Sequence, residues 1–245
     1  MKQPLITVIT VTFNALEALK ETAQSTWTQD YPNLEHIIVD GASKDGTEEW
    51  LKKIDSQQVS GAASCLVRWI SEPDKGIYDA MNKGVTMAKG EYCIFMNAGD
   101  TFVDEHVISR MFAQAKAEVD VIYGDIMKNG HLKSSLSPRN CHKMFYCHQG
   151  VFTRTSCLRD FPFDISHRYS ADFKQAKQLF LAGKCFLHVK MPVANFDTNG
   201  VSNTQRSKGL WDNVKVVSEV DSFKDKCRFL PHLLFPWLMC KLRGK

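Results

Sequence analysis

The first half of the chain alternates between short runs rich in β-branched residues and longer stretches with helical periodicity. The strand-like runs are residues 5–12, 34–40, 66–71, 92–96 and 119–123. The helices expected between them are residues 15–29, 47–54, 77–88 and 105–117. Strands separated by helices form βαβ units. The pattern therefore predicts an α/β fold, a three-layer α/β/α sandwich around a mainly parallel, Rossmann-like sheet.

The second half is less regular. Asn129-Gly130 predicts a hairpin turn, 150–154 a strand and 172–181 a helix, with a polar loop over 195–203. We find no internal repeat, no low-complexity segment and no linker between independent domains. We therefore predict one domain over residues 1–205 and a helical, basic and apolar tail over residues 206–245.

Polar side chains recur at the point where each predicted strand ends. They are Thr12 to Asn14, Asp40, Asp74 and Lys75, and Asn97 and Asp100. Ligands of open parallel sheets bind beyond the carboxyl ends of the strands, which all lie at one edge. A crevice lined by these groups suits a nucleotide and a cation.

Each of these residues has a plainer interpretation when taken alone. Asp40 is also a typical turn residue before a helix, and Asn14 a typical N-cap of the helix that follows it. Asp100, in Asn97-Ala98-Gly99-Asp100, can bind Mg²⁺ or Mn²⁺, but it equally suits an Asx turn.

Composition and missing motifs exclude several classes of function. The net charge of +4 is small for a protein dedicated to nucleic-acid binding. The turn at Phe13-Asn14-Ala15 contains no glycine, so the dinucleotide fingerprint fails, and no P-loop pattern occurs. A hydride-transfer enzyme and an ATPase thus lose their main support.

The eight cysteines are interpreted as reduced thiols of a cytosolic protein, because a chain of 245 residues does not need disulfides to fold. Zinc binding by Cys141-His142 and Cys147-His148 is less favoured, since their spacing matches no usual zinc motif. We find no secretory signal and no apolar run of about 18 residues, the length that would span a bilayer.

The segment 229–242 is apolar, contains Trp237, and has lysines and arginines around it. Two interpretations remain equally open: a segment lying on an anionic membrane surface, and a helix packed on the main domain. Pro231 and Pro236 predict that it is not a single long helix.

Three segments together resemble the family 2-type glycosyltransferases of GT-A fold. They are ITVITVTFNALEALKETAQST, IIVDGASKDGT and SEPDKGIYDAMNKGVTMAKGEYCIFMNAGD. The resemblance covers about residues 4–200 and is strongest up to Asp100. It is closest to the transferases that build bacterial exopolysaccharide, capsule or O-antigen, including colanic-acid-type enzymes. Residues 1–123 would then bind the nucleotide sugar and residues 124–205 the acceptor.

The resemblance also implies a role for each matching residue. Thr12 and Asn14 would lie at the nucleotide pocket, Asp40 at the base, and Asp74 and Lys75 near the ribose and diphosphate. Asn97 and Asp100 would replace the family's Asp-x-Asp element, with Asp100 as the ligand of Mg²⁺ or Mn²⁺. Asp172 would be the catalytic base, and His148 and Gln149 would lie near the acceptor.

The sequence departs from the family at Asn97 and Gly99, where acidic residues are usual, so the diphosphate would have to supply several metal ligands. The resemblance implies an inverting transferase that uses a nucleotide sugar, with UDP-sugars the common donors. The acceptor would be a saccharide, free or on a polyprenyl diphosphate, at the cytoplasmic face of the plasma membrane. The alternatives are a nucleotidyltransferase that makes a nucleotide sugar, and a nonenzymatic protein that binds one.

Overall fold

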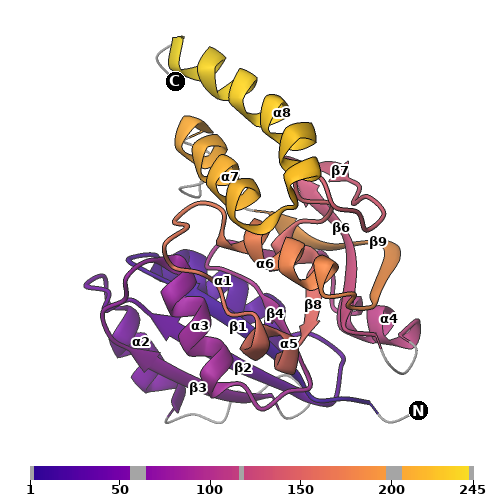
Figure 1. Ribbon diagram of the computed structural model, residues 1–245. Helices are drawn as coiled ribbons and strands as arrows, with labels where there is room; N and C mark the ends of the chain where they lie inside the picture. The colour runs from indigo at the N-terminus through magenta and orange to yellow at the C-terminus, as the bar shows by residue number, and fades with distance from the viewer. Residues whose placement is uncertain (1–2, 56–64, 116–118, 197–205, 243–245) are drawn as a thin grey trace.

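The computed structural model describes residues 3–55, 65–115, 119–196 and 206–242 (Figure 1). Its first half contains four parallel strands: β1 (Ile6–Thr12), β2 (Leu34–Asp40), β3 (Leu66–Ser71) and β4 (Tyr92–Phe95). β1 lies between β2 and β4, and β3 lies outside β2. The predicted strands of this half are confirmed to within a residue or two, except that the fifth, predicted at 119–123, runs over Val121–Lys128.

The remaining strands extend the same sheet. β8 (Val151–Arg154) is antiparallel to both β4 and β6 (Val121–Lys128), and β9 (Phe186–Phe196) is parallel to β6. β5 (Thr101–Phe102) pairs with the end of β9. β7 (His131–Lys133) forms a hairpin with β6, closed by the predicted turn at Asn129-Gly130. The order in the sheet is therefore β3-β2-β1-β4-β8-β6-β9-β5.

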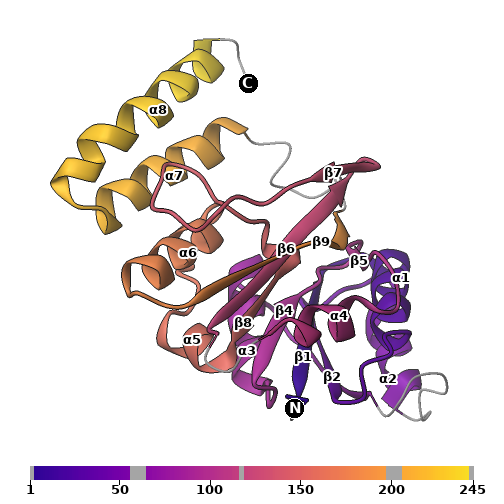
Figure 2. The same cartoon turned by 90° about the vertical axis from the view of Figure 1, so that its right-hand side faces the viewer.

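Helices cover both faces of the sheet, as the burial of every residue of β1 requires. Ile6 and Val8 belong to the core beneath α4 (Val107–Ala113), on the face that also carries α1 (Leu16–Trp27) and α2 (Thr47–Asp55). Ile9 and Val11 face the opposite core. That core lies beneath α3 (Ile77–Met87), α5 (Thr155–Asp160) and α6 (Ala171–Leu181), as Figure 2 shows. The three-layer α/β/α prediction is confirmed.

The chain ends in an antiparallel pair of helices, α7 (Arg206–Val220) and α8 (Phe223–Leu242), which lies beyond α6 (Figures 1 and 2). Phe173 of α6 packs with Val217 of α7 and with Phe229 and Leu233 of α8. These contacts attach the pair to the sandwich.

The expectation that the prolines prevent one long helix is wrong. Pro231 and Pro236 both lie inside α8. Each removes one backbone hydrogen bond, at a cost of about 3 kcal/mol in a helix interior. The packing of Phe229 and Leu233 against α7 offsets that loss.

Two further expectations are corrected. Asn14 is not the N-cap of α1, because that position is Ala15, and the Leu16 N–H instead donates to the Asp45 carboxylate at 2.9 Å. The loop expected over 195–203 begins too early, since Asn195 pairs with Thr101 inside the sheet. Phe196 also belongs to β9, and residues 197–203 of the predicted loop lie outside the described residues.

No helix in the described part of the chain is long and apolar enough to cross a membrane. All eight cysteines lie in described segments, and all are free thiols.

Candidate functional site

The strand order reverses at β1, and we call the region beyond the carboxyl ends of the strands at this reversal the crevice. From β1 the chain crosses to β2 on one side, whereas β4 pairs with β1 on the other side. Such a reversal of strand order is where ligands bind in open α/β sheets. The loops after β1 and β4 contain Thr12 to Asn14 and Asn97 to Asp100, so the predicted residues lie around this point.

Asp40 anchors the first side of the crevice. Its side chain is fully buried, and its Oδ2 accepts hydrogen bonds from Ser43 N at 3.0 Å and from Ser71 Oγ at 2.6 Å. A short hydrogen bond from Ser43 Oγ reaches Oδ1. The carboxylate thus joins the ends of β2 and β3 and shapes the loop between β2 and α2.

Gly41 allows the next loop to approach closely. A Cβ atom at Gly41 would lie 2.6 Å from Asp74 Oδ2, so no larger residue fits without moving Asp74. Asp74 in turn accepts the Gly76 N–H at 2.8 Å. Lys75 is exposed beside it. The loop that contains Asp74 and Lys75 therefore lies against the end of β2, with the Lys75 side chain exposed.

The loop after β1 is held by that after β2. Asn14 N donates to Ser43 Oγ at 2.7 Å, and Lys44 N donates to Asn14 Oδ1 at 2.9 Å. Asn14 and Ala42 both adopt left-handed backbone conformations, with φ of 49° and 64°. Such conformations are uncommon outside glycine and persist where the surroundings enforce them.

A chain of polar contacts forms the second side of the crevice. Asn97 Nδ2 lies 3.2 Å from His148 Nε2, and His148 Nδ1 lies 3.5 Å from Asp172 Oδ2. Tyr78 donates its hydroxyl to Asp172 Oδ1 at 2.9 Å. The His148 ring thus lies between the Asn97 amide and the Asp172 carboxylate. The structure thus brings together three predicted residues from the end of β4, a 3-10 turn (His148–Gly150) and α6.

Asp172 lies in the first turn of α6, and its side chain is 21% exposed. Burial alone would raise its pKa, but hydrogen bonds and charge from His148, with the Tyr78 hydroxyl and the Phe173 N–H, lower the pKa below its usual value. The helix N-terminus also favours the anion. Asp172 is therefore an ionised, partly accessible carboxylate at neutral pH.

Tyr78 belongs to this group of polar contacts, but the sequence analysis did not predict it as a site residue. It lies 94 positions before Asp172, and its aromatic ring is buried against Phe163. A tyrosine at the start of an apolar helix face reads as ordinary core, so only the contact itself reveals its part in the site.

Asp100 follows a tight turn that α1 supports. Asp100 N donates to Asn97 O at 2.8 Å, and Gly99, with φ of 102°, donates its N–H to Thr22 Oγ1 at 2.9 Å. Two buried oxygens near this edge, Thr12 Oγ1 and Asn97 Oδ1, have no hydrogen-bond partner among the described residues.

These residues fit a hard cation. Asp100 supplies a carboxylate and Asn97 an unpartnered amide oxygen, both of the ligand type that Mg²⁺ and Mn²⁺ prefer. Within the described segments no group of three potential acidic, histidine or cysteine ligands surrounds Asp100. A cation there would thus take most of its ligands from a bound phosphate group.

A separate group of ligand type lies at Asp164, His167 and Glu219. The Lys174 ammonium already lies 2.6 Å from both Asp164 Oδ2 and Glu219 Oε2. The cluster is thus compensated by a protein cation, and we interpret it as a link between α6 and α7.

Gln149, predicted to lie near the acceptor, is the neighbour of His148 in the 3-10 turn. It is buried, and its amide oxygen accepts the Cys147 thiol at 3.1 Å. It supports the turn that presents His148.

The sequence of this chain is similar to those of known glycosyltransferases. The family model for Glycosyl transferase family 2 matches residues 7–184. An uncharacterised glycosyltransferase of Mycobacterium tuberculosis (strain H37Rv) is 27% identical over 229 residues, which cover 89% of this chain and 84% of the relative. A PGL/p-HBAD biosynthesis glycosyltransferase of Mycobacterium bovis (strain BCG) is 28% identical over 214 residues, covering 83% and 81%.

Solved structures share the architecture. Staphylococcus aureus TarS 1–349 in complex with UDP superposes with a TM-score of 0.68 at 17% identity, over 94% of this chain and 70% of TarS. The mannosyltransferase PcManGT from Pyrobaculum calidifontis, in complex with GDP-Man and Mn²⁺, gives 0.70 at 18% identity, over 89% and 64%. The fold is thus the GT-A fold of nucleotide-sugar-dependent glycosyltransferases. This chain belongs to glycosyl transferase family 2 and is a glycosyltransferase.

Proposed function

We propose that the enzyme transfers a sugar, with inversion at the anomeric carbon, from a UDP-sugar to a saccharide acceptor in the synthesis of a cell-surface polysaccharide. The observation that carries the proposal is the contact chain from Asn97 through His148 to Asp172. It places an ionised carboxylate beside the turn that contains Asp100, at the edge where a nucleotide sugar binds in this fold.

The donor lies along the ends of β1 to β4 in this proposal, within residues 1–123. Thr12, Asn14 and Asp40 form the nucleoside end, with Thr12 Oγ1 unpartnered in the described structure. Asp74 and Lys75 lie near the ribose and diphosphate, and Asn97 lies where the diphosphate meets the sugar. UDP is favoured because UDP is the nucleotide bound to TarS, and PcManGT shows that the fold also accepts GDP-Man.

Asp172 acts as the general base. It takes the proton from the acceptor hydroxyl, whose oxygen forms the new bond to the anomeric carbon. The bond from that carbon to the diphosphate breaks on the opposite face, and the electron pair leaves with the nucleoside diphosphate. His148 and Tyr78 hold the carboxylate ionised and fixed in direction.

Asp100 and Asn97 would hold Mg²⁺ or Mn²⁺ together with the donor diphosphate. When bound, such an ion would supply positive charge to stabilise the departing diphosphate. Lys75 adds a second positive charge on the same side.

The acceptor binds on the side formed by residues 124–205, at His148, with Gln149 supporting the turn. We propose that the acceptor is linked to a polyprenyl diphosphate and that the tail, 206–245, contacts the membrane at the cytoplasmic face. Leu234, Leu238 and Leu242 recur every four residues on an exposed side of α8, and Phe235 beside them is 70% exposed. Apolar side chains in such a row, with lysine nearby, suit an anionic membrane surface.

The test is release of UDP from a panel of UDP-sugars, with and without a lipid extract of bacterial membranes as acceptor. We expect one UDP-sugar to give release that the extract stimulates severalfold. Consumption of a nucleoside triphosphate with a sugar phosphate would instead indicate a nucleotidyltransferase. Binding of a UDP-sugar without any release would indicate a nonenzymatic binding protein.

A further inference from the structure

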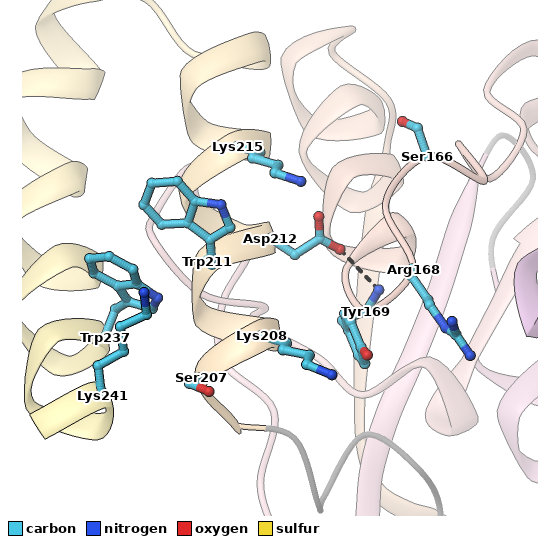
Figure 3. Close-up of a pocket in the computed structure, with 10 residues that line it drawn as sticks. All are labelled: Ser166, Arg168, Tyr169, Ser207, Lys208, Trp211, Asp212, Lys215, Trp237 and Lys241. Atoms are coloured by element: carbon cyan, nitrogen blue, oxygen red, sulfur yellow. Dashed lines mark hydrogen bonds between the residues drawn. The ribbon is translucent and has the colours of Figure 1, made fainter. Parts of the chain in front are cut away.

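A second cavity, of about 550 Å³, lies between the loop before α6 and the facing sides of α7 and α8 (Figure 3). Its lining includes three aromatic residues, Tyr169, Trp211 and Trp237. The sequence analysis assigned none of them to a ligand-binding site. None of the residues described above at the crevice is among those that line this cavity.

The charges of this cavity are strongly unbalanced. Arg168, Lys208, Lys215 and Lys241 line it, and Asp212 is its acidic residue. Asp212 is already bound, because its two oxygens accept the Tyr169 N–H at 2.9 Å and contact His167 Nδ1 at 3.0 Å. Among the described residues, no carboxylate lies within 4.0 Å of the cationic groups of Arg168, Lys208 or Lys215. Cations gathered in a cavity without partner anions attract an anionic ligand.

The aromatic wall adds a second kind of recognition. The rings of Trp211 and Trp237 lie 4.6 Å apart at 30°, and Trp211 is 41% exposed. Lys208, Trp211 and Lys215 are spaced three and four residues apart, so they share one face of α7. A ligand that fits this wall bears its negative charge next to an apolar or ring-shaped part.

The cavity adjoins the proposed catalytic base. Tyr169 lies three residues before Asp172, so their Cα atoms are within about 11 Å. The hydrogen bond from Tyr169 N to Asp212 joins the loop before α6 to α7. A molecule held in the cavity can therefore extend toward Asp172 along the start of α6.

We propose that this cavity binds the phosphate or diphosphate group of the acceptor and so positions the acceptor hydroxyl at Asp172. The assignment rests on the proposed transferase function and adds to it the place where the phosphate group of the acceptor binds. A neutral saccharide would give four cations no counter-charge, whereas a diphosphate offers oxygens to several of them at once.

Binding is tested by calorimetry on the full chain with three probes: inorganic diphosphate, farnesyl diphosphate and farnesol. The variant is Lys208→Gln/Lys215→Gln, which changes exposed side chains of α7 and leaves its buried face intact. We expect the dissociation constant for farnesyl diphosphate to rise about tenfold or more. The control, Lys224→Gln/Lys226→Gln, removes the same charge from α8 outside the cavity and should bind as the unmodified protein does.

The three probes also identify the source of the phosphate. Tighter binding of farnesyl diphosphate than of inorganic diphosphate, lost in Trp211→Ala, indicates a lipid carrier. Equal binding of both, weakened by the double lysine change, indicates a soluble or polymeric phosphate. No binding of either, binding that the lysine change leaves unaltered, or equal binding of farnesol would overturn the proposal. UDP binding, measured separately on the unmodified protein, tests the donor site, so failure of one does not imply failure of the other.

Discussion

At the scale of single residues, Asp172 has the most direct chemical consequence. We expect Asp172→Asn to reduce transfer about 10²- to 10⁴-fold, the usual contribution of a general base, because the amide cannot accept the proton. UDP binding should be retained, since Asp172 lies on α6 and outside the donor strands. Initial rates with saturating donor, together with calorimetry of UDP, measure the two quantities.

The matched control is Asp160→Asn, which neutralises an exposed carboxylate at the end of α5. It should leave both rate and affinity unchanged. Near-normal turnover by Asp172→Asn would remove Asp172 from the role of base.

His36 gives a prediction about stability and pH. Its ring is fully buried; Trp27 Nε1 donates to Nδ1 at 3.1 Å, and Nε2 lies 2.9 Å from Thr10 Oγ1. Burial lowers its pKa to about 3. Below its unfolded pKa of about 6.5, the unfolded chain binds a proton that the folded chain does not. Stability contributed by neutral His36 is therefore lost as the pH falls from about 6.5 toward 3.

Between pH 7 and pH 5 this group should reduce the free energy of unfolding by about 2 kcal/mol. Urea denaturation at the two pH values measures the change, and His36→Gln is the comparison, because Gln does not titrate. An equal pH dependence in both proteins would show that His36 titrates normally in the fold.

At the scale of elements, Lys174 connects α6 to α7. Its ammonium contacts Asp164 and Glu219, and this hydrogen bonding lowers the pKa of both carboxyls. Groups whose pKa falls on folding stabilise the fold above about pH 4, and that contribution is lost as the pH drops through the lowered values.

We expect Lys174→Met to destabilise the protein by about 1 kcal/mol at pH 7, a modest value because both carboxylates are partly exposed. Lys52→Met, which removes a solvent-exposed pair with Glu48, should leave stability essentially unchanged, because exposed ion pairs contribute little. Hydrogen exchange should increase in α7 for the first variant. Equal effects of the two changes would contradict a special role for Lys174.

Helices and strands whose sequence pattern lies within their own segment could be predicted, whereas those that depend on distant contacts could not. β1, β2 and β4 are fully buried runs flanked by turn residues, so each could be predicted from its own segment. β9 could not, because Phe186–Phe196 contains Pro192 and lacks alternation; its pairing depends on the bulge opposite Asp125 in β6. The continuity of α8 through two prolines likewise depends on α7, which is a tertiary contact.

Some residues of the candidate site could likewise be predicted from local sequence, and others could not. Asp40 ends β2, and Asn97 and Asp100 lie in the turn after β4, so the sequence could place all three at one edge. The contact between His148 and Asp172, and the approach of Tyr78, join segments far apart in the chain. They depend on how α3, α6 and the 3-10 turn pack, which no local pattern reports.

At the scale of the whole molecule, the exposed apolar row on α8 predicts membrane association. Phe235→Glu/Leu238→Glu places two charges in that row and should abolish flotation with vesicles that contain phosphatidylglycerol. Both side chains are at least half exposed, so the fold should be unaffected.

The control is Phe223→Glu, at the other end of α8, where the side chain is 83% exposed. This variant should float with the vesicles as the unmodified protein does. Unchanged flotation of the double variant would show that the tail does not contact the membrane through this face.

The central claim, a metal-assisted site for a nucleotide donor, is tested most directly by thermal unfolding with UDP, GDP, CDP, dTDP and ADP, each with Mn²⁺, Mg²⁺ or chelator. A ligand at about 100 times its dissociation constant stabilises the folded state by about 2.7 kcal/mol. In a chain of this size that raises the Tm by roughly 5 to 10 °C. We predict such a shift with UDP and a divalent cation, reduced by chelator and by Asp100→Asn. No shift with any nucleotide would contradict the account.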